Sequence, residues 1–334
     1  MQNKFYSPLL NNLQVNNMNI SIVDYSPHFK PHILDLFKKT FQKEMSEEFW
    51  NWRFEKNPYG KPIIKLAFLN EKLVGNYLLH PVRMEWNGKT IRPLFSMTTM
   101  TDPDFSGKGI MTNLATQVYE SARHNNFDFI FAFVNNNSRH LFTKKLGFKE
   151  LQIMSELSFD THQVIDFESD LYCEKIDFFD DSFSNFYNEQ TNNLDHIIVP
   201  RTKEYLNWRY VKHPEISYYC YQILSNGILQ GFFILKIHQN KTCHIVDFFI
   251  KNSEDVYKSM ISTSISFCKE FSLSNLTLWV NNQLPLYSFL QNIGFHSSKQ
   301  STYFVVKKLN PIKFDKMLFD YNKWYLTMSD SDVY

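Results

Sequence analysis

The sequence predicts an α/β protein made of two tandem domains, each a mixed, mostly antiparallel sheet flanked by helices. Three observations support this: a strand–turn–helix–strand unit in residues 95–134, several antiparallel strands before it, and the recurrence of first-half segments in the second half. The 334 residues suit two domains, since a domain typically holds roughly 100–200 residues. With 43% hydrophobic and 17% aromatic residues, the chain can fill two cores.

The N-terminal part of the chain alternates strands and helices. Residues 1–17 are expected to form an Asn-rich arm of uncertain order. A strand at 20–24, a helix at 32–41 and a helical segment capped by Ser46 are predicted next, followed by strands at 64–69 and 73–80. Asn87-Gly88 predicts a hairpin that joins strands 82–86 and 90–94.

The central unit combines a strand that ends near Thr101, a turn with Gly107 and Gly109, a helix at 110–124 and a buried strand at 129–134. Two glycines allow a tight turn, and a helix that starts there directs unpaired N–H groups toward the turn. The unit therefore predicts an anion site. The glycines alone are also compatible with an ordinary strand-to-helix turn.

Several first-half segments return in the second half. The separations agree, with 95 residues from Trp52 to Gly147 and 86 from Trp208 to Gly294. A tandem repeat is therefore predicted, with domains at 18–160 and 161–310 and a C-terminal tail at 311–334. The repeated segments are WRFEKNP at 52–58 with WRYVKHP at 208–214, AFVN at 132–135 with LWVN at 278–281, and LGF at 146–148 with IGF at 293–295.

The second half lacks the glycine turn. Its corresponding segment, FIKNSEDV at 249–256, has no glycine and adds the carboxylates of Glu254 and Asp255. Because these charges would repel a phosphate, we expect one active and one degenerate half. The repeated Trp-Arg pairs are expected to pack, since both halves have them, although Trp50 and Trp52 could also line an acceptor site.

The segment DPDFSGKGI at 102–110, with Asn135-x-x-Ser138 and the LGF at 146–148, resembles the acetyl-CoA signature of the GNAT acyltransferase superfamily. The resemblance covers residues 18–160 and implies the GNAT fold and acetyl-CoA as co-substrate. It implies cofactor contacts by Thr99, Met100, Thr101, Ser106, Gly107, Lys108, Gly109, Ile110, Met111, Asn135, Ser138 and Phe142.

Acyl transfer needs a base that deprotonates the amine, hydrogen-bond donors for the oxyanion, and a proton or other stabilisation for the leaving thiolate. The resemblance implies a general-acid tyrosine at the position where this sequence has Phe142. Either another group protonates the thiolate, or the thiolate leaves without a general acid, or the protein has lost activity. Catalytic candidates are His80, Asn135 and, in the tail, Asp330 and Asp332. Residues 327–334 of the tail are expected either to be disordered or to enter a cleft between the halves, as in some tandem GNAT enzymes; in the second case their deletion should abolish turnover without lowering the melting temperature.

His80 could also be a structural residue, and Asn135 part of a polar turn with Ser138 as a helix N-cap. The predicted function is N-acetylation of a small polar amine acceptor. By resemblance alone, the first hypothesis is a nucleotide-linked amino sugar of surface polysaccharide biosynthesis. The alternatives are an aminoglycoside, polyamine or peptide acetyltransferase, and a non-catalytic CoA-binding module.

Composition limits the other partners. A net charge of +1, from 35 basic and 34 acidic residues, argues against nucleic acid. No apolar run reaches the ~18 residues that a membrane span needs. Cys173, Cys220, Cys243 and Cys268 have no ligand spacing, so we expect no metal and reduced, buried thiols of a cytoplasmic protein. A homodimer is compatible with the apolar content.

Overall fold

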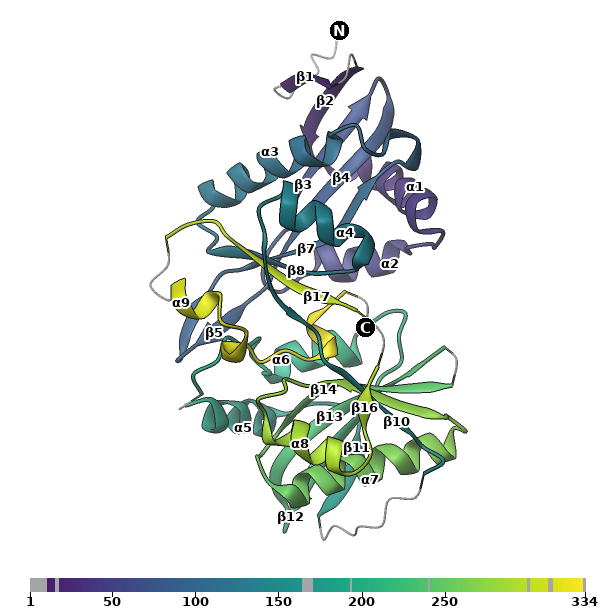
Figure 1. Cartoon of the computed structure of the whole chain (residues 1–334), viewed down its shortest axis with the longest axis vertical. Coiled ribbons are helices and arrows are strands. Elements are labelled where there is room, and N and C mark those ends of the chain that lie inside the picture. Colours follow the sequence, from purple (N-terminus) through teal and green to yellow (C-terminus); the bar gives the residue numbers. More distant parts are fainter. Residues whose placement is uncertain are drawn as a thin grey trace, which may run out of the picture.

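The structure, a computed structural model, describes residues 11–15, 18–163, 171–192, 194–239, 241–298, 301–311 and 315–332. Two large mixed sheets, of eight and seven strands, form the two halves of the molecule (Figure 1). Both are mostly antiparallel and carry helices, which confirms the predicted fold class. Among the described residues no helix is long and apolar enough to cross a membrane.

The first sheet has the order β1-β2-β3-β4-β7-β8-β17-β9, and only β7 and β8 run parallel. A separate two-stranded sheet, β5-β6, lies outside it. The strands are β1 (Asn11–Val15), β2 (Met18–Asp24), β3 (Ile63–Leu69), β4 (Lys72–Pro81), β5 (Met84–Trp86), β6 (Lys89–Ile91), β7 (Leu94–Thr101), β8 (Phe129–Val134), β9 (Lys149–Ile153) and β17 (Tyr303–Lys308). The helices are α1 (Lys30–Phe41), α2 (Glu47–Trp50), α3 (Ile110–His124) and α4 (Asn136–His140).

The second sheet has the order β11-β12-β13-β14-β15-β10-β16, with β14 and β15 parallel. Its strands are β10 (Glu156–Asp160), β11 (Tyr172–Ile176), β12 (Tyr219–Ser225), β13 (Ile228–His238), β14 (Thr242–Ile250), β15 (Asn275–Trp279) and β16 (His296–Ser297). The helices are α5 (Asp181–Thr191), α6 (Lys203–Leu206), α7 (Glu254–Glu270), α8 (Pro285–Asn292) and, in the tail, α9 (Asp315–Leu318). Each copy of the Trp-Arg segment forms a π-helical turn, η2 (Asn51–Glu55) and η5 (Asn207–Val211).

Most expected elements of the first half are confirmed, and α3 and β8 have the predicted bounds. Two expectations differ. The hairpin at Asn87-Gly88 is present, but its strands are short and pair only with each other. Within the expected N-terminal arm, β1 forms a strand that pairs with β2.

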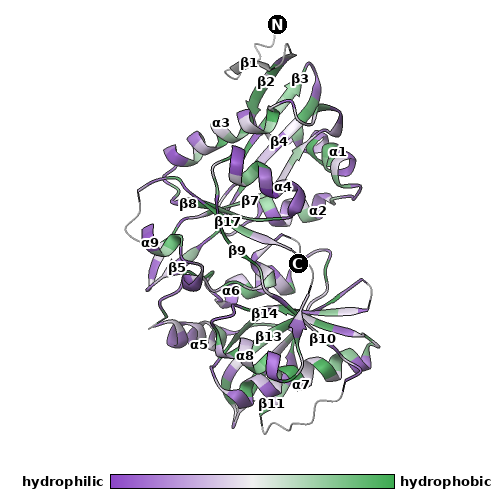
Figure 2. Cartoon of the chain, in the orientation of Figure 1, coloured by the Kyte–Doolittle hydropathy of each residue, from purple (hydrophilic) through white to green (hydrophobic). Residues whose placement is uncertain are grey.

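Each sheet is covered on one face by its own long helix. The side chains of Ile110, Leu114 and Val118 recur every four residues along α3 and are buried against the first sheet. Burying one such Leu contributes about 1.5–3 kcal/mol. Helix α7 covers the second sheet in the same way. Figure 2 shows both hydrophobic and hydrophilic residues along α3, as expected for a helix with one buried face.

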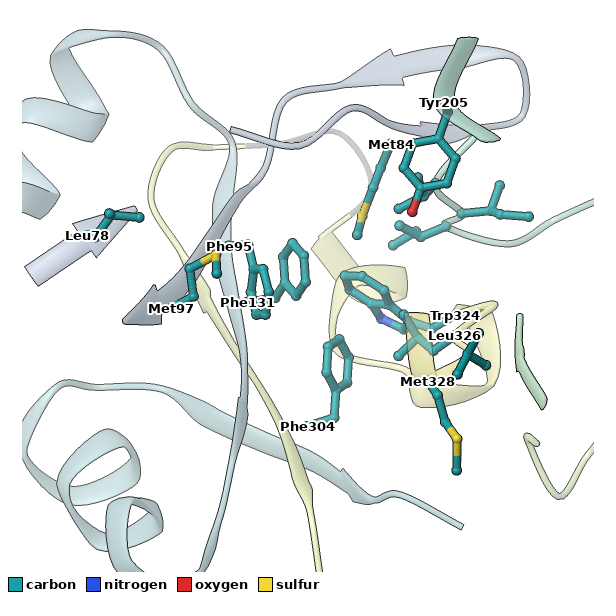
Figure 3. Close-up of a cluster of buried hydrophobic side chains, with 14 of the residues drawn as sticks. Leu78, Met84, Phe95, Met97, Phe131, Tyr205, Phe304, Trp324, Leu326 and Met328 are labelled. Atoms are coloured by element: carbon teal, nitrogen blue, oxygen red, sulfur yellow. The ribbon is translucent and has the colours of Figure 1, made fainter. Parts of the chain in front are cut away.

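The other faces of the two sheets share one core. This cluster joins Phe95 and Phe131 of the first half with Phe304 of β17 and Trp324 and Met328 of the tail, which Figure 3 shows side by side. The rings of Phe304 and Trp324 meet edge to face, with their centroids 4.8 Å apart. The tail residues 315–332 are therefore ordered and packed between the halves, so disorder is excluded for this part.

Two strands cross between the halves. β17, from the end of the second repeat, pairs with β8 and β9 in the first sheet, and β10, from the end of the first repeat, pairs with β15 and β16 in the second. The expected division of the chain at residue 160 follows the repeat in the sequence. It places these two strands in the half opposite to the sheet they join.

Candidate active site

Strands β7 and β8 separate after a short paired region. The paired residues are Leu94 with Ile130 and Phe95 with Phe131, after which β7 continues to Thr101 without this partner. On the other side of β7 the register shifts, Thr98 has a φ of 52°, and its carbonyl accepts a 2.8 Å hydrogen bond from Asn76 Nδ2. We call this separation the β7–β8 fork. It leaves one backbone edge of residues 97–101 open to a strand-like ligand.

The turn after β7 leads directly into α3. Gly107 and Gly109 have φ values of 75° and 81°, and a Cβ added at Gly107 would meet nothing within 4 Å. The first turn of α3 leaves N–H groups without intrahelical partners, and the first helical bond is from Asn113 N to Gly109 O. The predicted donor Ser106 differs, because its N–H already donates to Pro103 O.

Asp102 holds this turn in place. Its buried carboxylate accepts a hydrogen bond from Lys39 Nζ of α1 at 2.7 Å and forms an ion pair with Lys72 Nζ of β4 at 2.8 Å. Burial alone would raise the pKa of Asp102, but the two lysines outweigh this and lower it to about 2. The carboxylate is therefore ionised at neutral pH and joins α1, β4 and the turn.

The other residues expected at the cofactor divide into two groups. Thr99 is half-buried with no described hydrogen-bond partner for its Oγ1, Thr101 is half-buried, and Lys108 lies over the Phe105 ring at the turn. The side chains of Met100, Ile110 and Met111 are buried in the cores, so only their backbone groups can serve a ligand.

Asn135 and Phe142 have structural contacts. Asn135 is exposed at the end of β8 and caps α4, since its Oδ1 accepts from the backbone N of Asn137 at 3.0 Å and of Ser138 at 3.1 Å. The N-cap is thus Asn135 and not Ser138. Phe142 is buried against Phe148, with ring centroids 5.0 Å apart. Its side chain faces the core beside α3.

A small cavity lies between the halves at the apex of the fork. Its volume is about 30 Å³. Phe95 and Phe131, the last paired residues of β7 and β8, form part of its wall. We call it the interface cavity; it is lined by Arg53, Tyr59, His80, Val82, Phe95, Phe131, Val199, Tyr205, Trp208, Ser329 and Asp330. It brings together two predicted catalytic residues, His80 and Asp330, while Asn135 and the exposed Asp332 are not in its wall.

Asp330 is held by a buried ionic network. Arg201 Nη2 lies 3.0 Å from Asp330 Oδ2 and 3.1 Å from Asp247 Oδ1, and none of the three side chains is exposed. Thr327 N donates to Asp330 Oδ2 at 2.8 Å, and Thr327 Oγ1 donates to Asp247 Oδ1 at 2.9 Å. Burial, together with the charge of Asp247, raises the pKa of Asp330 although Arg201 opposes the shift.

Sequence reasoning missed Arg201 and Asp247. One signal was available, because Asp247 is the only Asp, Glu, Lys or Arg in the mostly apolar strand TCHIVDFFI at 242–250. A carboxylate inside a buried strand predicts a buried partner. The partner itself could not be named from the sequence.

His80 is a neutral, buried imidazole. It is 1% exposed, and burial and then the charge of Arg53 lower its pKa well below the usual value. Its Nδ1 has no hydrogen-bond partner among the described residues. The ring packs edge-on against Phe54 at 5.8 Å. The nitrogen of a neutral imidazole that carries no proton can accept a hydrogen bond from a ligand in the cavity.

The second half has a similar strand separation, which the tail occupies. β14 and β15 pair only as far as Ile245 with Leu278. Beyond this point Tyr325 OH donates to the carbonyl of Phe248 at 2.5 Å. No glycine precedes α7, whose first turn contains Glu254 and Asp255 as expected. Among the described residues no group of three or more His, Cys, Asp or Glu could hold a metal ion.

A forked parallel strand pair, a glycine turn and a helix N-terminus together define a GNAT-type acyltransferase domain. Residues 24–150 match the family model described as an acetyltransferase (GNAT) domain. This match shows that the first half of the chain contains a GNAT acetyltransferase domain, which supports an acyltransferase, and GNAT proteins use acetyl-CoA as co-substrate. A comparison with curated proteins finds no match.

Similar solved structures include a probable N-acyltransferase from Enterococcus faecalis V583, with 14% identity and a TM-score of 0.69 over 87% of this chain and 73% of that one. A GCN5-related N-acetyltransferase from Anabaena variabilis has 12% identity, the same TM-score and the same coverage. A tandem GNAT protein from the clavulanic acid biosynthesis pathway has 11% identity and a TM-score of 0.61, with 88% of this chain and 100% of that one covered. At these identities the likeness concerns the fold.

Proposed function

We propose that this protein transfers the acetyl group of acetyl-CoA to the amine of a small polar acceptor whose reacting end enters the interface cavity. The observation that carries the proposal is the meeting of His80 and Asp330, which lie 250 positions apart in the chain, at the apex of the β7–β8 fork. The fork is where a thioester would lie if the open edge of β7 paired with the pantetheine arm.

The described residues fit acetyl-CoA at three places. The open space at Gly107 and the start of α3 suit the pyrophosphate, with Lys108 adding charge. The free edge of residues 97–101 offers backbone donors for the pantetheine arm and the thioester oxygen. Bound acetyl-CoA supplies the activated acetyl carbon for attack by the amine.

Each remaining task has a candidate residue. Asp330 attracts the acceptor ammonium, and His80 Nδ1 accepts the proton that the nitrogen must lose before attack. Since Phe142 faces the core, it does not act on the leaving group. The proton that the nitrogen carries after attack passes to the sulfur as the C–S bond breaks, so CoA leaves as the thiol.

We retain a nucleotide-linked amino sugar as a proposed acceptor. One fold similar to this chain belongs to a glucosamine N-acetyltransferase region of a fungal enzyme, with 14% identity and a TM-score of 0.59. One water needs at least about 10–15 Å³, so a cavity of about 30 Å³ suits an amine group and not a sugar ring. A sugar would therefore enter only by the end that carries its amine.

The non-catalytic CoA-binding module is a second candidate, favoured by the core position of Phe142. Four free cysteines suit a reducing compartment, so we place the protein in the cytoplasm; a homodimer stays a prediction.

The test of the proposed function is release of CoA thiol from acetyl-CoA with a panel of amines, for the wild type and His80→Gln. Turnover that depends on His80 supports the enzyme. Binding of acetyl-CoA without turnover on any amine supports the module.

A further inference from the structure

We propose that the acceptor carries a carboxylate close to its amine and that Arg53 binds this carboxylate. The inference rests on the proposed function, because it names the chemistry of the molecule that the interface cavity receives. Amino acids have this chemistry, and so do amino sugars that bear a carboxylate. The argument starts from the partners of Arg53.

Arg53 is a buried cation that forms no ion pair within the part of the chain that the structure describes. It is 8% exposed, and no described carboxylate lies within 4.0 Å of its guanidinium. Within the described ranges its Nη2 contacts the sulfur of Met97, at 3.8 Å, and its Nε is buried without a hydrogen-bond partner. A buried charge in this state is costly unless something pairs with it.

Arg201 provides an internal comparison. It lies in the same interface and is completely buried, yet it has two carboxylates, Asp247 and Asp330, within 3.1 Å. Among the described residues, therefore, one interface arginine is paired with carboxylates and the other contacts a thioether. We infer that the partner of Arg53 comes from outside the described chain.

The surroundings of Arg53 strengthen its preference for an anion. Its guanidinium carbon lies 5.8 Å from the ring centres of both Trp52 and Trp208. Burial and then the charge of Arg209 lower its pKa to about 10, although Tyr205, Asp332 and Tyr218 oppose the shift. Arg53 stays protonated at neutral pH, and Asp332 is exposed.

The cavity places opposite charges on its wall. Arg53 lines it together with Asp330 and His80. A ligand group with an amine and a carboxylate a few atoms apart satisfies both kinds of residue, with the amine toward Asp330 and His80 and the carboxylate toward Arg53. A volume of about 30 Å³ suits such a head group, and the rest of the acceptor lies outside.

The test compares acceptors that differ only in the carboxylate. The panel contains the α-amino acids, their primary amides, the corresponding amines, galactosamine and galactosaminuronic acid, with kcat/KM from CoA thiol release. We expect the wild type to prefer carboxylated acceptors over matched amides at least tenfold. In Arg53→Gln this ratio should fall toward one, whereas Arg83→Gln, an exposed arginine paired with Glu85, should keep it.

The two sources of the carboxylate separate within the panel, since amino acids and galactosaminuronic acid are independent arms. Equal use of acids and amides by the wild type overturns the inference, and so does an equal loss on both by Arg53→Gln. Melting curves of Arg53→Gln and Arg53→Lys exclude misfolding, and Arg53→Lys should retain part of the ratio. If no amine supports turnover, the proposed function fails separately. Protection of the wild type but not of Arg53→Gln against melting by the same acids then still supports the carboxylate site, and equal protection overturns it.

Discussion

Trp52 and Trp208 stack on each other across the interface between the halves. Their ring centroids are 4.8 Å apart with an interplanar angle of 19°, and Trp52 Nε1 donates a 3.0 Å hydrogen bond to the carbonyl of Trp208. The two copies of the repeated Trp-Arg segment therefore meet each other. This confirms the packing role expected for them and makes the repeat itself the contact between halves.

Trp52→Ala should destabilise the protein by about 3–5 kcal/mol, as for other large buried side chains, because it removes the stack and leaves a cavity. Urea unfolding followed by circular dichroism measures the change. Phe178→Ala is the control, since this aromatic side chain is 62% exposed, and its change should stay near zero. A similar small change for both variants would contradict a role for the stack.

Gly107→Glu should abolish acetyl-CoA binding, because it puts a carboxylate where the pyrophosphate is expected. Gly227→Glu is the matched control: this glycine also has a positive φ, 77° against 75°, and equally open surroundings, but it lies in the second half. Calorimetry on both variants is the measurement. Normal binding by Gly107→Glu would remove the turn from the cofactor site.

His80→Gln should lower kcat by about 10²–10⁴-fold, which is the usual contribution of a general base. The KM for acetyl-CoA should stay near that of the wild type, since His80 lies at the acceptor side of the fork. Steady-state kinetics with both substrates varied separate the two constants. A normal kcat would assign His80 to packing.

Buried histidines should make the protein less stable in mild acid. Burial, and then His238 and Lys236, lower the pKa of His244 to about 3. A group with a depressed pKa stays neutral when folded, whereas the unfolded chain takes up a proton below about 6.5, so stability falls as the pH drops from 6.5 toward 3. His244→Gln should reduce this slope by up to about 1.4 kcal/mol per pH unit. Urea unfolding at a series of pH values tests it, with the exposed His140→Gln expected to keep the wild-type slope.

Deletion of residues 327–334 should abolish turnover and also lower the melting temperature. The expectation from the sequence was an unchanged melting temperature. The structure gives a reason for a decrease, because Thr327, Met328 and Asp330 are buried and Arg201 would lose one of its two carboxylates. Differential scanning calorimetry and the CoA thiol assay test both parts. Asp330→Asn, which keeps an acceptor atom for Thr327 N, separates the charge from the packing.

The local elements were predictable because their signals are local. The period of α3 and the glycines before it are visible within twenty residues, and both have the expected bounds. For residues 327–334 a position between the halves was one of two expectations, and it is confirmed for the described residues 327–332. The roles of His80, Asn135, Asp330 and Asp332 stay predictions.

Long-range pairing was not predictable from the same patterns. The apolar run of β17 indicates a strand but not the sheet it joins, and the ion pairs of Arg201 connect residues 46 and 129 positions apart. Phe142 matches a family position by spacing, yet spacing does not give the direction of a side chain. Its burial against Phe148 became clear only in three dimensions.

The exchange of β10 and β17 also has a consequence for biosynthesis. β17 lies between β8 and β9, so the first sheet stays open at β8 until residues 303–308 have left the ribosome. Until then, the nascent N-terminal half has an unpaired strand edge, which is the kind of surface that chaperones bind. Because each sheet contains a strand from the other repeat, gene fission or recombination at the repeat boundary would separate each sheet from one of its strands.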